Sequence, residues 1–123
     1  MDLIKYLGIE TIELTAQKVR LRLAVTPQVS QPAGLVHGGI NCVLAETAAS
    51  LGASYQLDKN QQAVGSQINT SHLCAVRQGW LWVQATPVRQ GRRQEVWIAR
   101  TYQKSPAETT SLSTVTLSII NST

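Results

Sequence analysis

The sequence predicts an α+β fold in which a curved antiparallel sheet of five to six strands wraps around one long central helix. Three observations favour it. One long segment is apolar or small on nearly every face, segments of alternating polarity lie on both sides of it, and short turn-forming stretches separate these segments. The 123 residues suit a single domain covering 1–123, because a chain of this length supports one hydrophobic core and rarely two.

Two strands are expected before the helix, at 9–14 and 18–25. Apolar and basic side chains alternate along the second segment, which places Val19, Leu21, Leu23 and Val25 on one face. A period of two is typical of a strand that is buried on one side. The first segment is its expected hairpin partner.

The helix is expected from Ile40 to about Leu57, directly after a pair of glycines. Helical spacing relates Ile40, Val43, Leu44, Thr47, Leu51 and Tyr55, and small residues fill the other faces. A helix that is apolar or small nearly all round is usually buried. We therefore expect this helix at the centre of the fold.

Four more strands are expected after the helix, at roughly 62–76, 79–89, 94–103 and 109–120. Short turns between them imply antiparallel pairing. In the first of these strands, alternation places Val64, Ser66, Ile68, Thr70, His72 and Cys74 on one face. One helix covers only one face of such a sheet and leaves its edges open, so a homo-oligomer is expected.

Composition narrows the partners and the compartment. The net charge of +4 favours an anionic partner, but the chain has neither a block of like charges nor the interleaved basic and aromatic residues that indicate nucleic acid. No apolar run is long enough to cross a bilayer, and the first ten residues lack the apolar core of a signal peptide. We therefore expect a cytoplasmic protein without membrane insertion and without a nucleic-acid partner.

Histidine and cysteine do not indicate a metal site. Cys42 and Cys74 are too few for a disulfide framework, and together with His37 and His72 they lack the spacing of a zinc site. We expect no metal and no cofactor.

Glu46 is the most informative candidate for chemistry. It is the only acid between Glu13 and Asp58, and it stands in mid-helix among apolar and small residues. Because burial of an unpaired carboxylate costs several kcal/mol, a buried Glu46 is expected to have a use. The alternative is that it lies on an exposed strip of the helix. Ser50 follows one turn later on the same face, within hydrogen-bonding reach.

The triplet His37-Gly38-Gly39 precedes the helix and is a second candidate. Free N–H groups at a helix N-terminus favour a negative oxygen, and glycines allow a ligand to approach closely. The alternative is an ordinary turn into the helix. Gly38 and Glu46 are separated by ~12 Å of helix, too far for both to reach one carbonyl easily. Gly38 of one subunit facing Glu46 of another would solve this, which suggests a site at a dimer interface.

Together these residues resemble the hotdog-fold acyl-CoA thioesterases, in particular the branch whose catalytic acid is a glutamate. The resemblance rests on Gln31-Pro-Ala-Gly-Leu-Val-His37-Gly38-Gly39, Leu44-Ala45-Glu46-Thr47, Ser50, Val64-Gly65, Ile68-Asn69, His72, Gly91-Arg92 and Val96-Trp97. The branch includes thioesterases for 1,4-dihydroxy-2-naphthoyl-CoA and 4-hydroxybenzoyl-CoA and the proofreading thioesterase of enterobactin synthesis.

The resemblance implies hydrolysis of an acyl- or aroyl-CoA thioester to the free acid and CoA. A candidate substrate is 1,4-dihydroxy-2-naphthoyl-CoA of quinone biosynthesis. Glu46 would be the nucleophile or the general base, and Gly38 N–H and Gln31 would hydrogen-bond the thioester carbonyl oxygen. His37 would orient the loop or contact the substrate, and Ser50 would position Glu46 or the attacking water.

The resemblance also implies residues that bind the substrate. His72 would line the acyl pocket or hold the product side, and the basic cluster of Arg89, Arg92 and Arg93 would meet the phosphates of CoA.

We therefore expect a homodimer or a dimer of dimers with active sites at the subunit interface. Two other functions stay open at this point, namely a hotdog dehydratase of hydroxyacyl thioesters and a non-catalytic acyl-CoA-binding module. Formation of an enoyl product would indicate the former, and release of free thiol would indicate hydrolysis.

Overall fold

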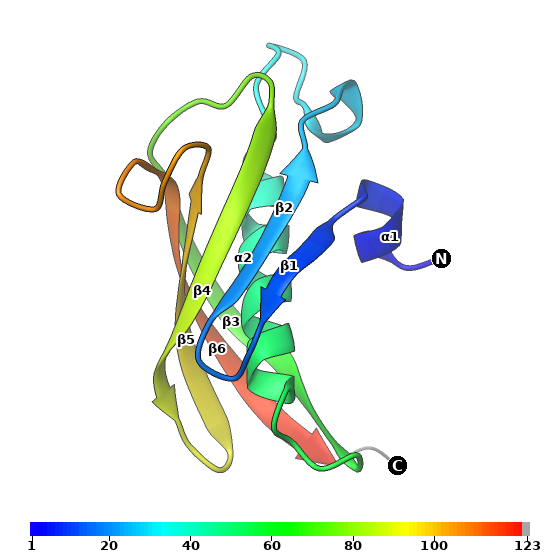
Figure 1. Ribbon diagram of the computed structural model, residues 1–123, viewed down its shortest axis with the longest axis vertical. Helices are drawn as coiled ribbons and strands as arrows, with labels where there is room; N and C mark the ends of the chain where they lie inside the picture. Colours follow the sequence, from blue (N-terminus) through cyan, green and yellow to red (C-terminus); the bar gives the residue numbers. More distant parts are fainter. Residues whose placement is uncertain (122–123) are drawn as a thin grey trace.

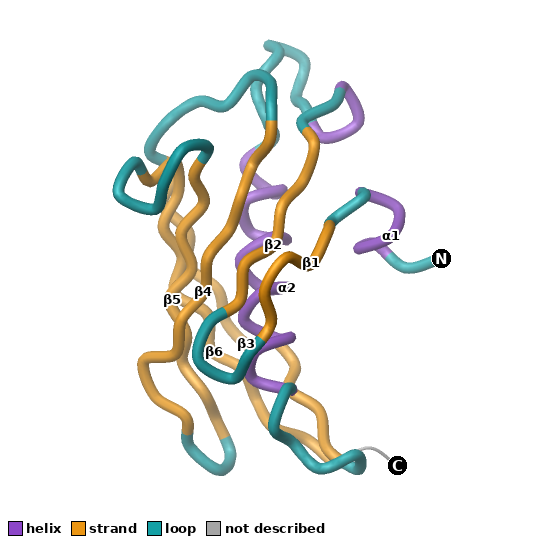
Figure 2. Tube along the Cα trace, in the orientation of Figure 1, coloured by secondary structure: helices purple, strands orange, loops and turns teal. Residues whose placement is uncertain are grey.

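A single long helix, α2 (Gly38–Ser54), packs lengthwise against one face of a six-stranded antiparallel sheet in the computed structural model, which describes residues 1–121 (Figure 1). In spatial order the strands are β1 (Glu10–Leu14), β2 (Val19–Ala24), β4 (Trp80–Gln90), β5 (Gln94–Tyr102), β6 (Thr109–Asn121) and β3 (Gln61–His72). The expected architecture, a curved antiparallel sheet around one long helix, is confirmed. The sheet ends in β1 on one side and in β3 on the other (Figure 2).

The core lies between α2 and the concave face of the sheet. Alternate residues of the strands point toward the helix, and their largest fully buried side chains are Trp97, Leu21, Leu23, Leu81 and Leu117, which pack with Leu44 of the helix. The helix meets them with small residues, since Ala45, Ala48, Ala49 and Ala53 are all buried. Small side chains let the helix approach the sheet closely, which explains why its sequence is poor in large apolar residues.

A short helix, α1 (Leu3–Leu7), precedes β1 and was not predicted. Asp2 caps it by accepting a hydrogen bond from Lys5 N–H at 2.9 Å, and Gly8 ends it with a φ of 74°. Both residues are ordinary signals for helix ends. A helix of one turn has no periodicity that the sequence could reveal.

Strand β3 differs from the prediction in the residue at which it ends and in which of its side chains share a face. It ends at His72 instead of residue 76, because Leu73 and Cys74 both donate to the carbonyl of Thr110 and the chain then leaves β6. A bulge between Gly65 and Gln67 inserts one residue opposite β6. The shared face predicted for Val64, Ser66, Ile68, Thr70, His72 and Cys74 is therefore wrong in part. Ile68, Thr70 and His72 do share a face, but the bulge reverses the alternation and puts Val64 on the opposite one, and Cys74 lies beyond the strand.

Within residues 1–121, no helix is both long enough and apolar enough for a membrane crossing.

Candidate active site

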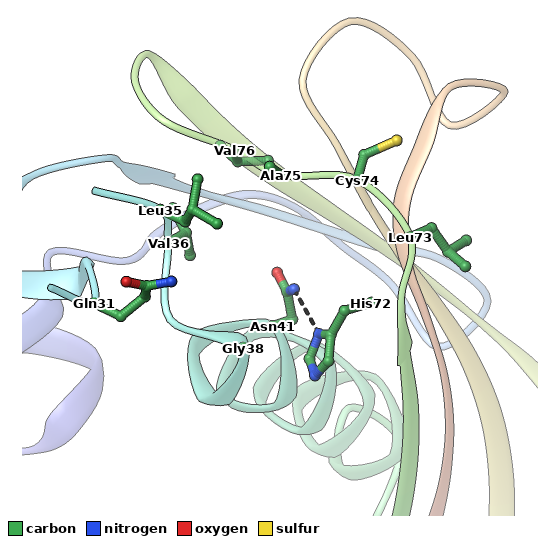
Figure 3. Close-up of a pocket in the computed structure, with 10 residues that line it drawn as sticks. All are labelled: Gln31, Leu35, Val36, Gly38, Asn41, His72, Leu73, Cys74, Ala75 and Val76. Carbon is green, nitrogen blue, oxygen red and sulfur yellow. Dashed lines mark hydrogen bonds between the residues drawn. The ribbon is translucent and has the colours of Figure 1, made fainter. Parts of the chain in front are cut away.

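A cavity of about 360 Å³ opens at the N-terminal end of α2 (Figure 3). The residues around it come from the loop before α2, from the first turn of the helix, and from the end of β3 with the segment that follows it. They include three of the predicted site residues, Gln31, Gly38 and His72, together with Asn41. The fold thus brings Gln31 and His72, which are 41 positions apart in the sequence, to one cavity.

The start of α2 leaves one backbone donor free. His37 is the N-cap, and its Nδ1 accepts a hydrogen bond from Gly39 N–H at 2.9 Å. Its carbonyl accepts from Ile40 N–H, also at 2.9 Å. Gly38 N–H makes no hydrogen bond within residues 1–121. A free N–H at the positive end of a helix is suited to hold a negative oxygen.

His37 itself is exposed and is not among the residues that line the cavity. Its ring is occupied by the capping hydrogen bond, and its own N–H donates to the carbonyl of Val29 at 2.9 Å. Of the two roles predicted for His37, the geometry therefore favours orientation of the loop over contact with the substrate.

His72 lies directly against Gly38. A Cβ atom on Gly38 would sit 2.8 Å from Nε2 of His72, closer than such contacts occur, so only glycine fits beside this ring. Nδ1 of the same ring is 3.0 Å from Nδ2 of Asn41. The sequence prediction missed Asn41, whose only local signal is a polar amide among the apolar and small residues of the helix.

Gln31 is held in a tight turn at the other side of the cavity. Its backbone N–H donates to the carbonyl of Leu35 at 2.7 Å, and its Oε1 accepts from Ala33 N–H. Gly34 completes the turn with a φ of 88°, which only glycine adopts without strain. Figure 3 shows the amide nitrogen of Gln31 turned toward the cavity. The side chain thus presents an N–H donor to whatever lies there.

Glu46 is exposed, so the prediction that it is buried is wrong for the single chain. The buried face of α2 consists of Asn41, Leu44, Ala45, Ala48, Ala49, Gly52 and Ala53, and Glu46 lies outside it. Its sequence neighbours Leu44, Ala45 and Ala48 are buried against the sheet, whereas the Glu46 side chain stays exposed beside the edge strand β3. Small residues on every side of a helix conceal which face is uncovered.

The Glu46 carboxyl group nevertheless occupies a defined place. A Cβ on Gly65 of β3 would sit 2.7 Å from both Cδ and Oε2 of Glu46, so the carboxyl group lies over the backbone of Gly65. It also lines a shallow hollow of about 240 Å³ with Ile4, Thr47, Ser50, Leu51 and Ser54. Ser50 thus shares the hollow with Glu46, as expected, but no hydrogen bond joins the two side chains within the described residues.

The cavity at Gly38 and the hollow at Glu46 do not share a residue. Both belong to α2, but they lie more than two helical turns apart along it. One chain therefore does not assemble the predicted catalytic groups around a single point.

The predicted CoA-binding arginines are also apart from the cavity. Arg89, Arg92 and Arg93 are exposed on the hairpin that joins β4 and β5. That hairpin lies at the end of the sheet where α2 finishes, whereas the cavity lies where α2 begins (Figure 1). Another cation, Arg77, is nearer, because it lines a hollow of about 550 Å³ that shares Gln31 with the cavity.

Comparison with known proteins identifies the family. The family model described as the thioesterase superfamily matches residues 33–110, which include Gly38, Glu46 and His72. A 1,4-dihydroxy-2-naphthoyl-CoA hydrolase of Listeria monocytogenes is 36% identical over 97 residues, which cover 79% of each chain. A proofreading thioesterase of Cronobacter turicensis is 35% identical over 95 residues, covering 77% of this chain and 69% of the relative.

Comparison with solved structures gives the same family. The crystal structure of a thioesterase from Haemophilus influenzae superposes with a TM-score of 0.89 at 35% identity, covering 96% of this chain and 82% of that one. A match of this extent leaves no alternative for the fold. The chain belongs to the thioesterase superfamily and adopts the hotdog fold that the sequence predicts.

Proposed function

We propose that this protein hydrolyses an acyl- or aroyl-CoA thioester to the free acid and CoA. The observation that carries the proposal is the unused N–H of Gly38 at the start of α2, beside the amide nitrogen of Gln31 in one cavity. Two N–H donors that line one cavity are suited to the negative charge that develops on a thioester carbonyl oxygen. The Listeria relative, named as a hydrolase of 1,4-dihydroxy-2-naphthoyl-CoA, supports that thioester as the first substrate to test.

Glu46 is the nucleophile or the general base in this mechanism. Its carboxylate either adds to the carbonyl carbon and expels the CoA thiolate, which leaves an anhydride for water to hydrolyse, or it takes a proton from a water that attacks directly. In both routes the carbonyl oxygen becomes negative, Gly38 N–H and Gln31 donate to it, and the thiolate takes up a proton as CoA leaves. Ser50, in the same hollow as Glu46, is placed to orient the carboxylate or the water.

The two halves of this site meet only if a second copy of the chain contributes one of them. Strand β3 is an open sheet edge of 12 residues, and a long unpaired edge is a template for pairing with another strand. If two β3 strands pair antiparallel across a two-fold axis, the two α2 helices run in opposite directions. Glu46, which lies over Gly65 of β3, is then at the interface, and we propose a register in which it faces the half of the partner's α2 that begins at Gly38. We therefore infer a homodimer, alone or in a dimer of dimers, with shared active sites.

The same pairing accounts for the hairpin arginines. Reversal of direction across the two-fold axis brings the end of one chain that carries Arg89, Arg92 and Arg93 to the end of the other that carries the cavity. We propose that these cations meet the CoA phosphates from the partner chain. Arginine suits this contact, because its planar group donates two parallel hydrogen bonds to a phosphate.

The test is hydrolysis by the wild type and by Glu46→Ala and Glu46→Gln, with Glu108→Gln as a control at an exposed glutamate that lines neither the cavity nor the hollow. The substrates are benzoyl-, 1,4-dihydroxy-2-naphthoyl- and medium-chain acyl-CoA, and released CoA is measured with a thiol reagent. We expect both Glu46 variants to fold normally and to lose about 100- to 10,000-fold in kcat, as for other catalytic carboxylates. Equal rates for the wild type and both variants would refute the mechanism. Enoyl formation from 3-hydroxyacyl-CoA without thiol release would indicate a dehydratase instead.

A further inference from the structure

Asn41 stands out as a polar side chain that the proposed mechanism does not use. It lies in the first turn of α2, is only 8% exposed, and lines the cavity at Gly38. Figure 3 shows its amide nitrogen directed at the ring of His72 and its oxygen directed away, toward the side of the cavity formed by Leu35 and Val36.

The buried amide oxygen of Asn41 lowers the stability of the folded protein. Oδ1 is buried and accepts no hydrogen bond within residues 1–121. A buried acceptor without a partner destabilises a protein, whereas an apolar side chain of similar volume at the same place would not. An asparagine at this position is therefore not explained by a gain in the stability of the fold. What the side chain does supply is the hydrogen bond to His72, 3.0 Å long.

That hydrogen bond determines where His72 carries its proton. An amide nitrogen can only donate, so Nδ1 of His72 must accept and has no hydrogen of its own. A neutral imidazole then carries its hydrogen on Nε2. Nε2 is the ring nitrogen that lies against Gly38, at 2.8 Å from the position of a Cβ on that residue.

We propose that Asn41 is a positioning residue for His72, and that it holds the imidazole in the Nε2–H tautomer so that this N–H becomes a third donor to the thioester carbonyl oxygen, beside Gly38 N–H and the Gln31 amide. This inference rests on the proposed function. It assigns a use both to the buried amide and to the contact between His72 and Gly38. It also makes His72 a donor to the reacting group, in addition to a wall of the acyl pocket.

The first test reads the tautomer directly and needs no substrate. Long-range ¹H–¹⁵N NMR distinguishes the two ring nitrogens of each histidine in the wild type, in Asn41→Leu and in the control Asn60→Leu, which alters an exposed asparagine outside the cavity. We expect the Nε2–H tautomer of His72 in the wild type and in the control, and a shift toward a mixture of tautomers in Asn41→Leu. An Nδ1–H tautomer in the wild type, or no change in Asn41→Leu, would overturn the proposal.

The second test compares kinetics with stability. Asn41→Leu is expected to lower kcat about tenfold or more with a smaller change in KM, which is the direction expected when a transition-state donor is misplaced. Its midpoint of urea unfolding should equal or exceed that of the wild type, because the unpaired oxygen is gone. A wild-type kcat in this variant would overturn the proposal, and so would a kcat loss that follows a loss of folded protein.

The third test uses two variants of His72 and examines the donor itself. His72→Gln keeps an amide N–H that can reach toward Gly38, and His72→Leu has no donor at all. We expect the glutamine variant to retain clearly more kcat than the leucine variant. Equal losses in both would refute the donor role of His72. If the wild type hydrolyses no thioester at all, the proposed function fails, but the NMR comparison still decides whether Asn41 positions His72.

Discussion

Gly65 shows how a single backbone position controls the candidate nucleophile. The Glu46 carboxyl group rests on it, and an added Cβ would lie 2.7 Å from Cδ, so Gly65→Ala must push the carboxyl group aside. A displacement of about 1 Å in a reacting group can cost roughly 100-fold in rate. We expect Gly65→Ala to lower kcat by about 10- to 100-fold while the protein stays folded, as checked by thiol release and circular dichroism.

Ser66→Ala provides the matched control for this variant. Ser66 is exposed, and its hydroxyl donates only to the carbonyl of Thr116 at 3.3 Å, so its loss should leave kcat near the wild-type value. A Gly65→Ala protein with wild-type kcat would mean that the position of the Glu46 carboxyl group does not matter for the reaction.

Gly52 plays a purely structural part in the same helix. A Cβ there would overlap the indole ring of Trp97, a fully buried side chain. On helix propensity alone, glycine to alanine in a helix should stabilise by roughly 0.5–1 kcal/mol. We expect the opposite sign for Gly52→Ala, a loss of about 1–3 kcal/mol from overpacking, measured by urea unfolding. A gain in stability would show that Trp97 can move away at little cost.

The residue scale is also where prediction from the sequence succeeded only in part. Gln31, Gly38 and His72 were predicted and do line one cavity. The glycine pair before the helix is a local signal for Gly38, whereas the roles of Gln31 and His72 were predicted from the resemblance to the thioesterases. Exposure of Glu46 could not be predicted, since a helix made of small residues does not reveal which face the sheet covers. The pairing of Asn41 with His72 depends on where β3 ends, which is a property of the whole sheet.

At the scale of elements, the β1–β2 hairpin is held by two ion pairs across its outer face. Arg20 Nε lies 2.8 Å from Glu13 Oε1, and Arg22 Nε lies 2.6 Å from Glu10 Oε1. Both pairs are partners in the strand register. Cross-strand pairs of opposite charge stabilise a sheet, and here they attach the edge strand β1 to the rest.

The pH dependence of this hairpin follows from Glu13. The hydrogen bond from Arg20, and secondarily the charge of Lys18, hold the pKa of the Glu13 carboxyl group below its ordinary value of 4.5. Because the pKa is lower in the folded protein than in the unfolded chain, the ion pair contributes its full stabilisation at pH values above the ordinary carboxyl pKa. This contribution is lost as the pH falls through the pKa of the folded state. We expect Glu13→Gln to lower the thermal midpoint slightly at pH 7.

The difference between the wild type and Glu13→Gln should then shrink as the pH falls below the ordinary carboxyl pKa of 4.5 and through the lower pKa of the folded state, where the wild-type carboxyl group takes up its proton. Melting curves at neutral and acidic pH measure it, and Glu108→Gln serves as a control because Glu108 belongs to no ion pair within residues 1–121. A difference that is independent of pH would show that the pair is not what Glu13 contributes.

Most elements could be predicted because each has a strong local pattern. The alternation in β2 and the turns at Gly79 and Gly91 gave strand positions within a few residues, and α2 was displaced by two or three residues at each end. The bulge in β3 could not be predicted, because it shifts the register without any break in composition. The five-residue helix α1 was missed because its two capping residues are its only signal.

At the scale of the whole molecule, the two sheet edges differ in how they are protected. Strand β1 has five residues and follows α1, whereas β3 has 12 residues, and most of its side chains are exposed in the single chain. A long, exposed edge is rarely left uncovered in a stable protein. Burial of β3 in a dimer would also partly bury Glu46, which reconciles its exposure in one chain with a catalytic role.

A heterodimer of two inactive variants tests this arrangement. Glu46→Gln removes the attacking group, and Gln31→Ala removes a donor to the carbonyl oxygen, so each homodimer should be strongly impaired. The two chains are given different affinity tags, co-expressed, and the mixed species is purified through both tags.

If each site combines Gln31 of one chain with Glu46 of the other, one of the two sites in the heterodimer carries both changes and the other carries neither. We therefore expect about half of the wild-type kcat per dimer. If both groups came from the same chain, every site would keep one defect, and the heterodimer would be as inactive as its parents.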